Sequence, residues 1–123
     1  MPEYHESTEV LSAHVLDEAR ALHSLKEEIE AADWYNQRAA ASDNASLKRI
    51  LIHNRNEEIE HASMLIEWLR RNMDGWQEQL ETYLFTEKDI LEVEEEAEEE
   101  ENESEPARSK SLDLGSLSQK GDA

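Results

Sequence analysis

At 123 residues the chain is long enough for one small domain, and three Gly and two Pro among abundant Ala, Leu, Glu and Lys favour an all-α fold. The absence of cysteine excludes disulfides, thiolate zinc sites and cysteine catalysis, and is compatible with a reducing cytoplasm. A formal net charge of −19 argues against nucleic acid as a ligand and favours cations or basic surfaces. No apolar run approaches ~18 residues and the N-terminus lacks signal-peptide features, so neither a membrane span nor secretion is expected.

The first predicted helix follows a cap at Ser7 or Thr8 and runs without a breaker to about Ala41. Its apolar stripe consists of Leu11, Val15, Leu22, Leu25, Ile29, Ala32, Tyr35 and Ala39. Because Glu28 falls inside this stripe, its carboxylate is expected to face a partner helix rather than water. The neighbouring glutamates are compatible with a solvated face: Glu9, Glu27 and Glu30.

A polar turn at residues 42–46 separates this helix from a second, predicted from about Ser46 to Asn72. A connection this short makes the two helices antiparallel neighbours. In the seam of the second helix a carboxylate and an imidazole, Glu58 and His61, stand where leucines are expected. Burying such groups unpaired is costly, so a compensating group, most simply a metal ion, is predicted. The seam reads Leu47, Leu51, Asn54, Glu58, His61, Leu65 and Trp68.

Glu28 and Glu58 are expected to lie level with each other across this hairpin. Both are separated from Asp43 in the turn by the same number of residues, which at ~1.5 Å per residue is about 22 Å. His61 lies one helical turn beyond Glu58, and Glu-x-x-His is the spacing with which di-metal carboxylate bundles present both side chains from one helix face. Such a bundle needs twice the ligands and helices that one hairpin offers, so a two-fold homodimer is predicted to complete it.

Carboxylate oxygens with one imidazole per metal suit iron or manganese, and zinc or cobalt would also bind. Carboxylates that bridge two metals stabilise the oxidised pair, which favours oxidation of iron(II) by dioxygen. Tyr35 and Trp34 flank the site, and the sequence leaves Tyr35 open as either a core aromatic or a redox or hydrogen-bond partner of the metals. His14, with Glu18 four residues later, is interpreted as structural or solvated.

Beyond the hairpin the composition changes. Gly75 is expected to end the second helix, a short amphipathic segment follows at residues 76–84, and residues 86–89 resemble a capping box. The glutamate-rich run at residues 92–105 repels itself and is predicted to be disordered or a weak helix, with a solubilising linker as its simplest role. The predicted fold is therefore an antiparallel two-helix hairpin with a short C-terminal helix, dimerising into a four-helix bundle and followed by a disordered acidic tail.

Four stretches of the chain resemble the encapsulated ferritin family, whose members work inside encapsulin shells. They are EEIEAADWY at 27–35, HNRNEEIEHA at 53–62, EWLRR at 67–71 and TYLFTE at 82–87. The resemblance covers about residues 10–91. It implies a two-helix protomer whose dimer rebuilds a ferritin-like ferroxidase centre, with dimers assembled into a decameric ring.

The resemblance also implies roles for individual residues. The metal ligands of a di-iron centre match Glu28, Glu58 and His61, and a peripheral metal-attracting site where iron enters matches Glu27 and Glu30. The positions beside the centre are Trp34 and Tyr35. The enzyme of this family oxidises iron(II) without enclosing a mineral, which the surrounding shell stores.

The sequence LDLGSL at 112–117 is similar to encapsulin cargo-loading peptides, apart from Leu114, where their pattern has Ile or Val. The implied division is a helical domain over residues 1–91, an acidic disordered linker over 92–111 and a loading peptide over 112–123. The implied location is the cytoplasm, inside an encapsulin nanocompartment. Two other interpretations remain open: a metal-buffering or metal-sensing helical dimer without turnover, and a coiled-coil adaptor in which buried Glu and His only set the register.

Overall fold

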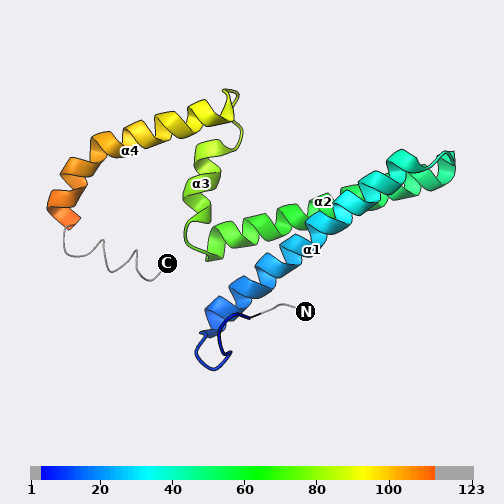
Figure 1. Cartoon of the computed structure of the whole chain (residues 1–123), viewed down its shortest axis with the longest axis horizontal. Coiled ribbons are helices and arrows are strands. Elements are labelled where there is room, and N and C mark those ends of the chain that lie inside the picture. The colour runs from blue at the N-terminus through cyan, green and yellow to red at the C-terminus, as the bar shows by residue number, and fades with distance from the viewer. Residues whose placement is uncertain (1–3, 113–123) are drawn as a thin grey trace. The chain divides into compact units, whose positions relative to one another are not determined.

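The computed structural model of the chain is all-helical over its described residues, 4–112, with side chains described to residue 103 (Figure 1). This confirms the predicted fold class. The helices are α1 Ala13–Ala41, α2 Ala45–Asn72, α3 Trp76–Tyr83 and α4 Ile90–Leu112. Contacts divide the chain into two compact units, with the boundary between Met73 and Asp74.

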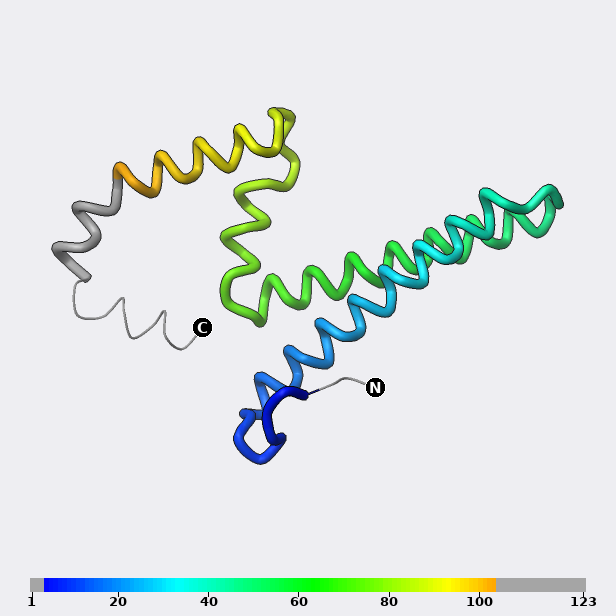
Figure 2. Tube along the Cα trace, in the orientation of Figure 1, coloured from blue at the N-terminus to red at the C-terminus, as the bar shows by residue number. Residues whose placement is uncertain are grey.

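The first unit is the predicted antiparallel hairpin, in which α1 and α2 run side by side from a three-residue turn (Figure 2). Asn44 is the cap of α2, and its side-chain oxygen accepts a hydrogen bond from the backbone N–H of Leu47 at 2.9 Å. The Ser42 hydroxyl in turn accepts from the N–H of Asn44 at 3.2 Å. These two bonds satisfy polar groups that a tight turn would leave exposed, and so fix the register of the two helices.

The start of α1 differs from the prediction of a cap at Ser7 or Thr8. The Ser7 carbonyl accepts from the N–H of Val10 at 3.0 Å and its hydroxyl accepts from the N–H of Glu9 at 3.2 Å, so this segment closes a turn of its own. The helix begins instead at Ala13, where the Ser12 hydroxyl accepts from Val15 N–H at 3.1 Å. Residues with capping side chains also favour turns, and at Ser7 the turn forms.

The hairpin has a narrow core. Leu69 is fully buried, and the other buried residues of the unit are Ala21, Leu25 and Ala39. Many large apolar side chains of both helices remain exposed in the single chain: Val15, Leu22, Ile29, Trp34, Leu47, Ile50, Ile59 and Met64. One chain therefore buries only part of its apolar surface, more than scattered exposed residues on a small protein would account for.

The open end of the hairpin is joined by His14. Its Nε2 lies 2.7 Å from the carbonyl oxygen of Asn72, the last residue of α2, and 3.2 Å from a carboxylate oxygen of Glu18. A donor at this position satisfies a carbonyl that the end of the helix leaves without an intrahelical partner. His14 and Glu18 thus connect the two helices, in keeping with the structural interpretation.

The second unit consists of α3 and α4, which contact each other. Gly75 precedes α3 with φ of 101°, a conformation that favours glycine. The hydroxyl of Thr86 donates to the carbonyl of Tyr83 at 2.9 Å, so it closes the end of α3 rather than forming the predicted capping box. Val93 of α4 is the buried apolar residue of this unit.

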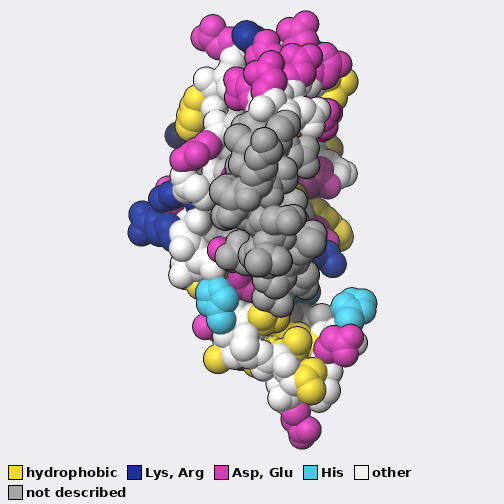
Figure 3. Space-filling model, turned by 90° about the vertical axis from the view of Figure 1, so that its left-hand side faces the viewer, with side chains coloured by type: hydrophobic (Ala, Val, Ile, Leu, Met, Phe, Trp, Pro, Cys, Tyr) yellow, Lys and Arg dark blue, Asp and Glu magenta, His cyan; other side chains and the backbone are white. Residues whose placement is uncertain are grey.

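The backbone of the glutamate-rich run is helical as part of α4, the second of the two alternatives predicted for it. Glutamate is a good helix former, and Lys88 binds Glu96 at 2.9 Å near the start of the helix, which offsets part of the charge repulsion. Figure 3 shows carboxylates gathered at the top of the view. No helix among the described residues combines the length and apolarity needed to cross a membrane. The predicted loading peptide, 112–117, lies outside the described residues apart from the backbone of Leu112.

Candidate metal centre

Three predicted ligands come together at the middle of the hairpin. One oxygen or nitrogen atom of each of Glu28, Glu58 and His61 lies within 4.8 Å of the others. His61 Nδ1 is 3.5 Å from Glu28 Oε2 and 3.7 Å from Glu58 Oε2. The level placement of Glu28 and Glu58 across the hairpin, predicted from their equal distance to the turn, is therefore confirmed.

Secondary structure explains this meeting. Glu58 and His61 are three residues apart on α2 and so leave the same helix face, while α1 delivers Glu28 from the opposite side. The Glu28 and Glu58 side chains are 26% and 21% exposed, and His61 is 41% exposed. The group therefore sits on the rim of the hairpin, partly withdrawn from water.

The electrostatics of the group favour a cation. The pKa of Glu28 is raised, first because it shares a hydrogen bond with Glu58, then through burial and the negative charge of Glu58, while His61 acts in the opposite direction. Two carboxyl groups this close resist being ionised together unless a positive charge lies between them. Two carboxylates and an imidazole directed at one point match the donor set that iron, manganese, zinc or cobalt binds. The residues present thus fit a metal ion.

Glu57 is a neighbour of the site that the sequence analysis does not single out. Its Oε2 lies 3.9 Å from His61 Nε2, the ring nitrogen on the side away from Glu28 and Glu58, and its Oε1 lies 3.5 Å from His53 Nε2. All three residues share one face of α2 at intervals of four. That spacing is the signal from which the contact could have been found.

Glu27 and Glu30, predicted as a peripheral site, lie away from this group in a shallow hollow of about 360 Å³ on α1. Ala31, Trp34, Tyr35 and Arg38 complete the hollow. The guanidinium carbon of Arg38 is 5.5 Å from the centre of the Trp34 ring and 5.4 Å from that of Tyr35, within range of cation–π attraction. Arg38 is a second residue that the sequence analysis does not single out.

Tyr35 is therefore placed with the peripheral carboxylates. Its described ring contact is with Arg38, and no hydrogen bond described for it reaches Glu28, Glu58 or His61. Its place in this hollow supports neither of the two roles left open for it over the other.

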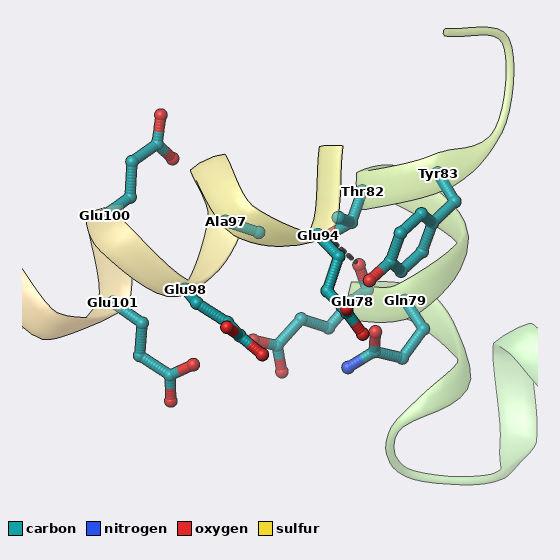
Figure 4. Close-up of a pocket in the computed structure, with 9 residues that line it drawn as sticks. All are labelled: Glu78, Gln79, Thr82, Tyr83, Glu94, Ala97, Glu98, Glu100 and Glu101. Carbon is teal, nitrogen blue, oxygen red and sulfur yellow. Dashed lines mark hydrogen bonds between the residues drawn. The ribbon is translucent and has the colours of Figure 1, made fainter. Parts of the chain in front are cut away.

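A second hollow, of about 590 Å³, lies between α3 and α4 (Figure 4). Glu78, Glu94 and Glu98 direct their carboxylates into it, whereas Glu100 points away. The hydroxyl of Thr82 donates to the carbonyl oxygen of Glu78 at 2.9 Å and so stays within its own helix. The hollow is strongly acidic, and it belongs to the unit that does not hold the three predicted ligands.

Comparison with known proteins places the hairpin and its neighbouring segments in a described family. Residues 3–87 match the family described as EncFtn-like. The chain is 57% identical over 94 residues to the "Ferritin-like protein" of Thermotoga maritima, covering 76% of this chain and 82% of that protein. It is 53% identical over 90 residues to the "Encapsulated ferritin-like protein" of Rhodospirillum rubrum, covering 73% of this chain and 64% of that protein.

A solved structure agrees with the fold. The crystal structure of protein ne0167 from Nitrosomonas europaea superposes with a TM-score of 0.68 at 52% sequence identity. The match covers 71% of this chain and 96% of that chain.

Proposed function

Since the chain belongs to the EncFtn-like family, we propose that it is a ferroxidase, which oxidises iron(II) to iron(III) with dioxygen at a centre formed between two chains. The observation that carries this proposal is the convergence of Glu28, Glu58 and His61 within 4.8 Å. The names of the two relatives, "Ferritin-like protein" and "Encapsulated ferritin-like protein", agree with an iron-handling role.

The dimer follows from what one hairpin lacks. A di-iron carboxylate bundle uses four helices, with a Glu from each of two and Glu-x-x-His from each of the others, and this chain supplies half of each. A two-fold axis beside the group duplicates Glu28, Glu58 and His61 and provides the missing half. The exposed apolar side chains of α1 and α2, among them Ile29, Ile59 and Met64, provide surface for such an interface.

The residues of the site have distinct roles in this scheme. Glu58 and His61 present an oxygen and a nitrogen from one face of α2, and Glu28 closes the site from α1. The proton held between Glu28 and Glu58 leaves when a cation takes its place. Iron supplies the redox chemistry when bound, since iron(II) is the substrate that gives its electron to dioxygen. Partial burial keeps the carboxylates oriented towards the cation rather than solvated separately.

The surrounding segments fit a path for the substrate and a place of delivery. Glu27 and Glu30 lie on the exposed surface of α1 beside the Trp34 and Tyr35 rings, where they attract cations before these reach the centre. The segment 112–123 docks the enzyme to an encapsulin shell, in whose interior the oxidised iron is stored, and dimers assemble into a decameric ring. The name "Encapsulated ferritin-like protein" of a 53% identical relative supports this part of the proposal.

Oxygen consumption tests the proposal. Adding iron(II) to the full-length protein in an oxygen-electrode cell should consume dioxygen faster than iron(II) in buffer alone. Glu58→Ala and His61→Ala should bring the rate close to that of buffer while circular dichroism shows unchanged helicity. Glu60→Ala, which alters a carboxylate between these two residues in sequence, is the matched control and should retain the rate. Metal binding by the wild type without oxygen consumption would establish the buffering or sensing dimer instead.

A further inference from the structure

Both ring nitrogens of His61 face carboxylates. Nδ1 lies 3.5 Å from Glu28 and 3.7 Å from Glu58, and Nε2 lies 3.9 Å from Glu57. A neutral imidazole carries its proton on one nitrogen and has a lone pair on the other, and only the lone pair binds a metal. The position of this proton therefore decides whether His61 is ready to act as a ligand beside Glu28 and Glu58.

We propose that Glu57 is a positioning residue that holds the proton of His61 on Nε2 and so leaves the Nδ1 lone pair directed at the metal site. This inference rests on the proposed function for the identity of the metal, but the proton position is a property of the metal-free protein. Metal-ligating histidines generally donate their other N–H to a carboxylate, carbonyl or water, which fixes both tautomer and ring orientation.

The position of Glu57 suits this role. It precedes His61 by four residues on α2, so both side chains leave the same face, and it contacts the ring on the side opposite to Glu28 and Glu58. The 3.9 Å separation is longer than a hydrogen bond, so attraction between the carboxylate and the N–H acts first, and the contact shortens when a metal fixes the ring. The Glu57 side chain is 44% exposed, so the effect is expected to be moderate.

His53 is the other titratable group that contacts Glu57. Its Nε2 lies 3.5 Å from Glu57 Oε1, whereas the contact to His61 uses Oε2, so the two imidazoles approach different oxygens of one carboxylate. His53 is 69% exposed and forms no described contact with the three predicted ligands. Removing His53 therefore leaves the Glu57–His61 contact in place, which makes His53→Ala a useful control.

The test measures the tautomer of His61 by ¹⁵N NMR of the metal-free protein at about pH 8, where histidine is mostly neutral. The wild type should show His61 protonated predominantly on Nε2. Glu57→Ala should shift the ¹⁵N signals towards a mixture of tautomers, and Glu57→Gln should give an intermediate result because its amide oxygen still accepts a hydrogen bond. Zinc affinity, followed through the His61 signals, should fall about 10-fold in Glu57→Ala, the lower end of the range for such supporting carboxylates.

Two controls separate positioning from a general loss of charge. Glu60→Ala removes a carboxylate adjacent to His61 in sequence, and His53→Ala removes the other partner of Glu57; both should leave the His61 signals and zinc affinity as in the wild type. Wild-type signals and affinity in Glu57→Ala, or an equal change in Glu60→Ala, would overturn the proposal. If Glu57→Ala shifts the tautomer but the wild-type protein consumes no dioxygen with iron(II), the positioning role stands and the ferroxidase proposal fails.

Discussion

Removing the negative charge of Glu28 should stabilise the metal-free protein at neutral pH. An oxygen of Glu28 and one of Glu58 lie within 4.8 Å. At that separation two unit charges repel by about 0.9 kcal/mol in bulk water and about 3.5 kcal/mol at an effective dielectric constant of ~20. The pKa of Glu28 is raised, so crowding by Glu58 outweighs the attraction of His61. Glu28→Gln removes one charge and places an amide N–H where the shared proton stood, and should stabilise the fold by about 1–3 kcal/mol.

The pH dependence of this effect has a defined sign. A carboxyl group whose pKa is raised on folding binds its proton more tightly in the native state, so stability falls as pH rises above its unfolded pKa of about 4.3. The wild type should therefore lose stability between about pH 4 and neutrality, whereas Glu28→Gln should lose less. The benefit of the substitution should be largest near neutral pH and small at about pH 4.

Thermal unfolding in the presence of a chelator, followed by circular dichroism, measures the effect. Since about 1 kcal/mol corresponds to roughly 4–8 °C in a domain of ~60–100 residues, Glu28→Gln should raise the Tm by at least about 4 °C at neutral pH. Glu27→Gln, the adjacent exposed carboxylate on α1, is the matched control and should change the Tm little. An unchanged or lowered Tm for Glu28→Gln, or an equal rise at about pH 4, would refute the account of the metal-free site.

Three further predictions concern other parts of the chain. Hydrogen bonds from Arg70 and then Arg71 lower the pKa of Glu67 to about 2, so its stabilising contribution is present above about pH 4.5 and lost as pH falls towards 2. Thermal unfolding should accordingly show a smaller loss of Tm on acidification for Glu67→Gln than for the wild type. Zinc titration in weak buffer should release more protons at about pH 5 than at about pH 8, since the raised pKa of Glu28 leaves more of its proton to displace at the lower pH; equal release would contradict this. Deleting residues 111–123 should leave iron oxidation in solution unchanged but prevent co-purification with a co-expressed encapsulin shell, and wild-type loading by the truncated protein would exclude docking through this segment.

The central group of the site was predictable because its geometry follows from chain length. Two long helices joined by a short turn have one antiparallel register, so equal distances from Asp43 place Glu28 beside Glu58, and helical spacing adds His61. The resemblance to encapsulated ferritins rests on motifs around these residues, and the family match over residues 3–87 confirms it. Their role as metal ligands remains a proposal.

Other features depend on competition between local interactions, which a pattern of residue types does not resolve. Ser7 closes a turn instead of capping α1, and Ser12 takes that role. The acidic run is helical, because repulsion between glutamates was weighed more heavily than their helix propensity and the Lys88–Glu96 pair. The side of the His61 ring that Glu57 faces depends on the orientation of the ring, which spacing alone does not determine.

A crystal structure of the protein soaked with iron, with anomalous scattering to locate the metal, tests the central claim most directly. The account predicts two metal ions ~3.5–4 Å apart on a two-fold axis between chains, the separation typical of two-metal sites. Each should be bound by Glu58 and His61 of one chain, with Glu28 of both chains completing the pair. A single metal held by one hairpin alone, or metal found only at Glu27 and Glu30, would contradict the account.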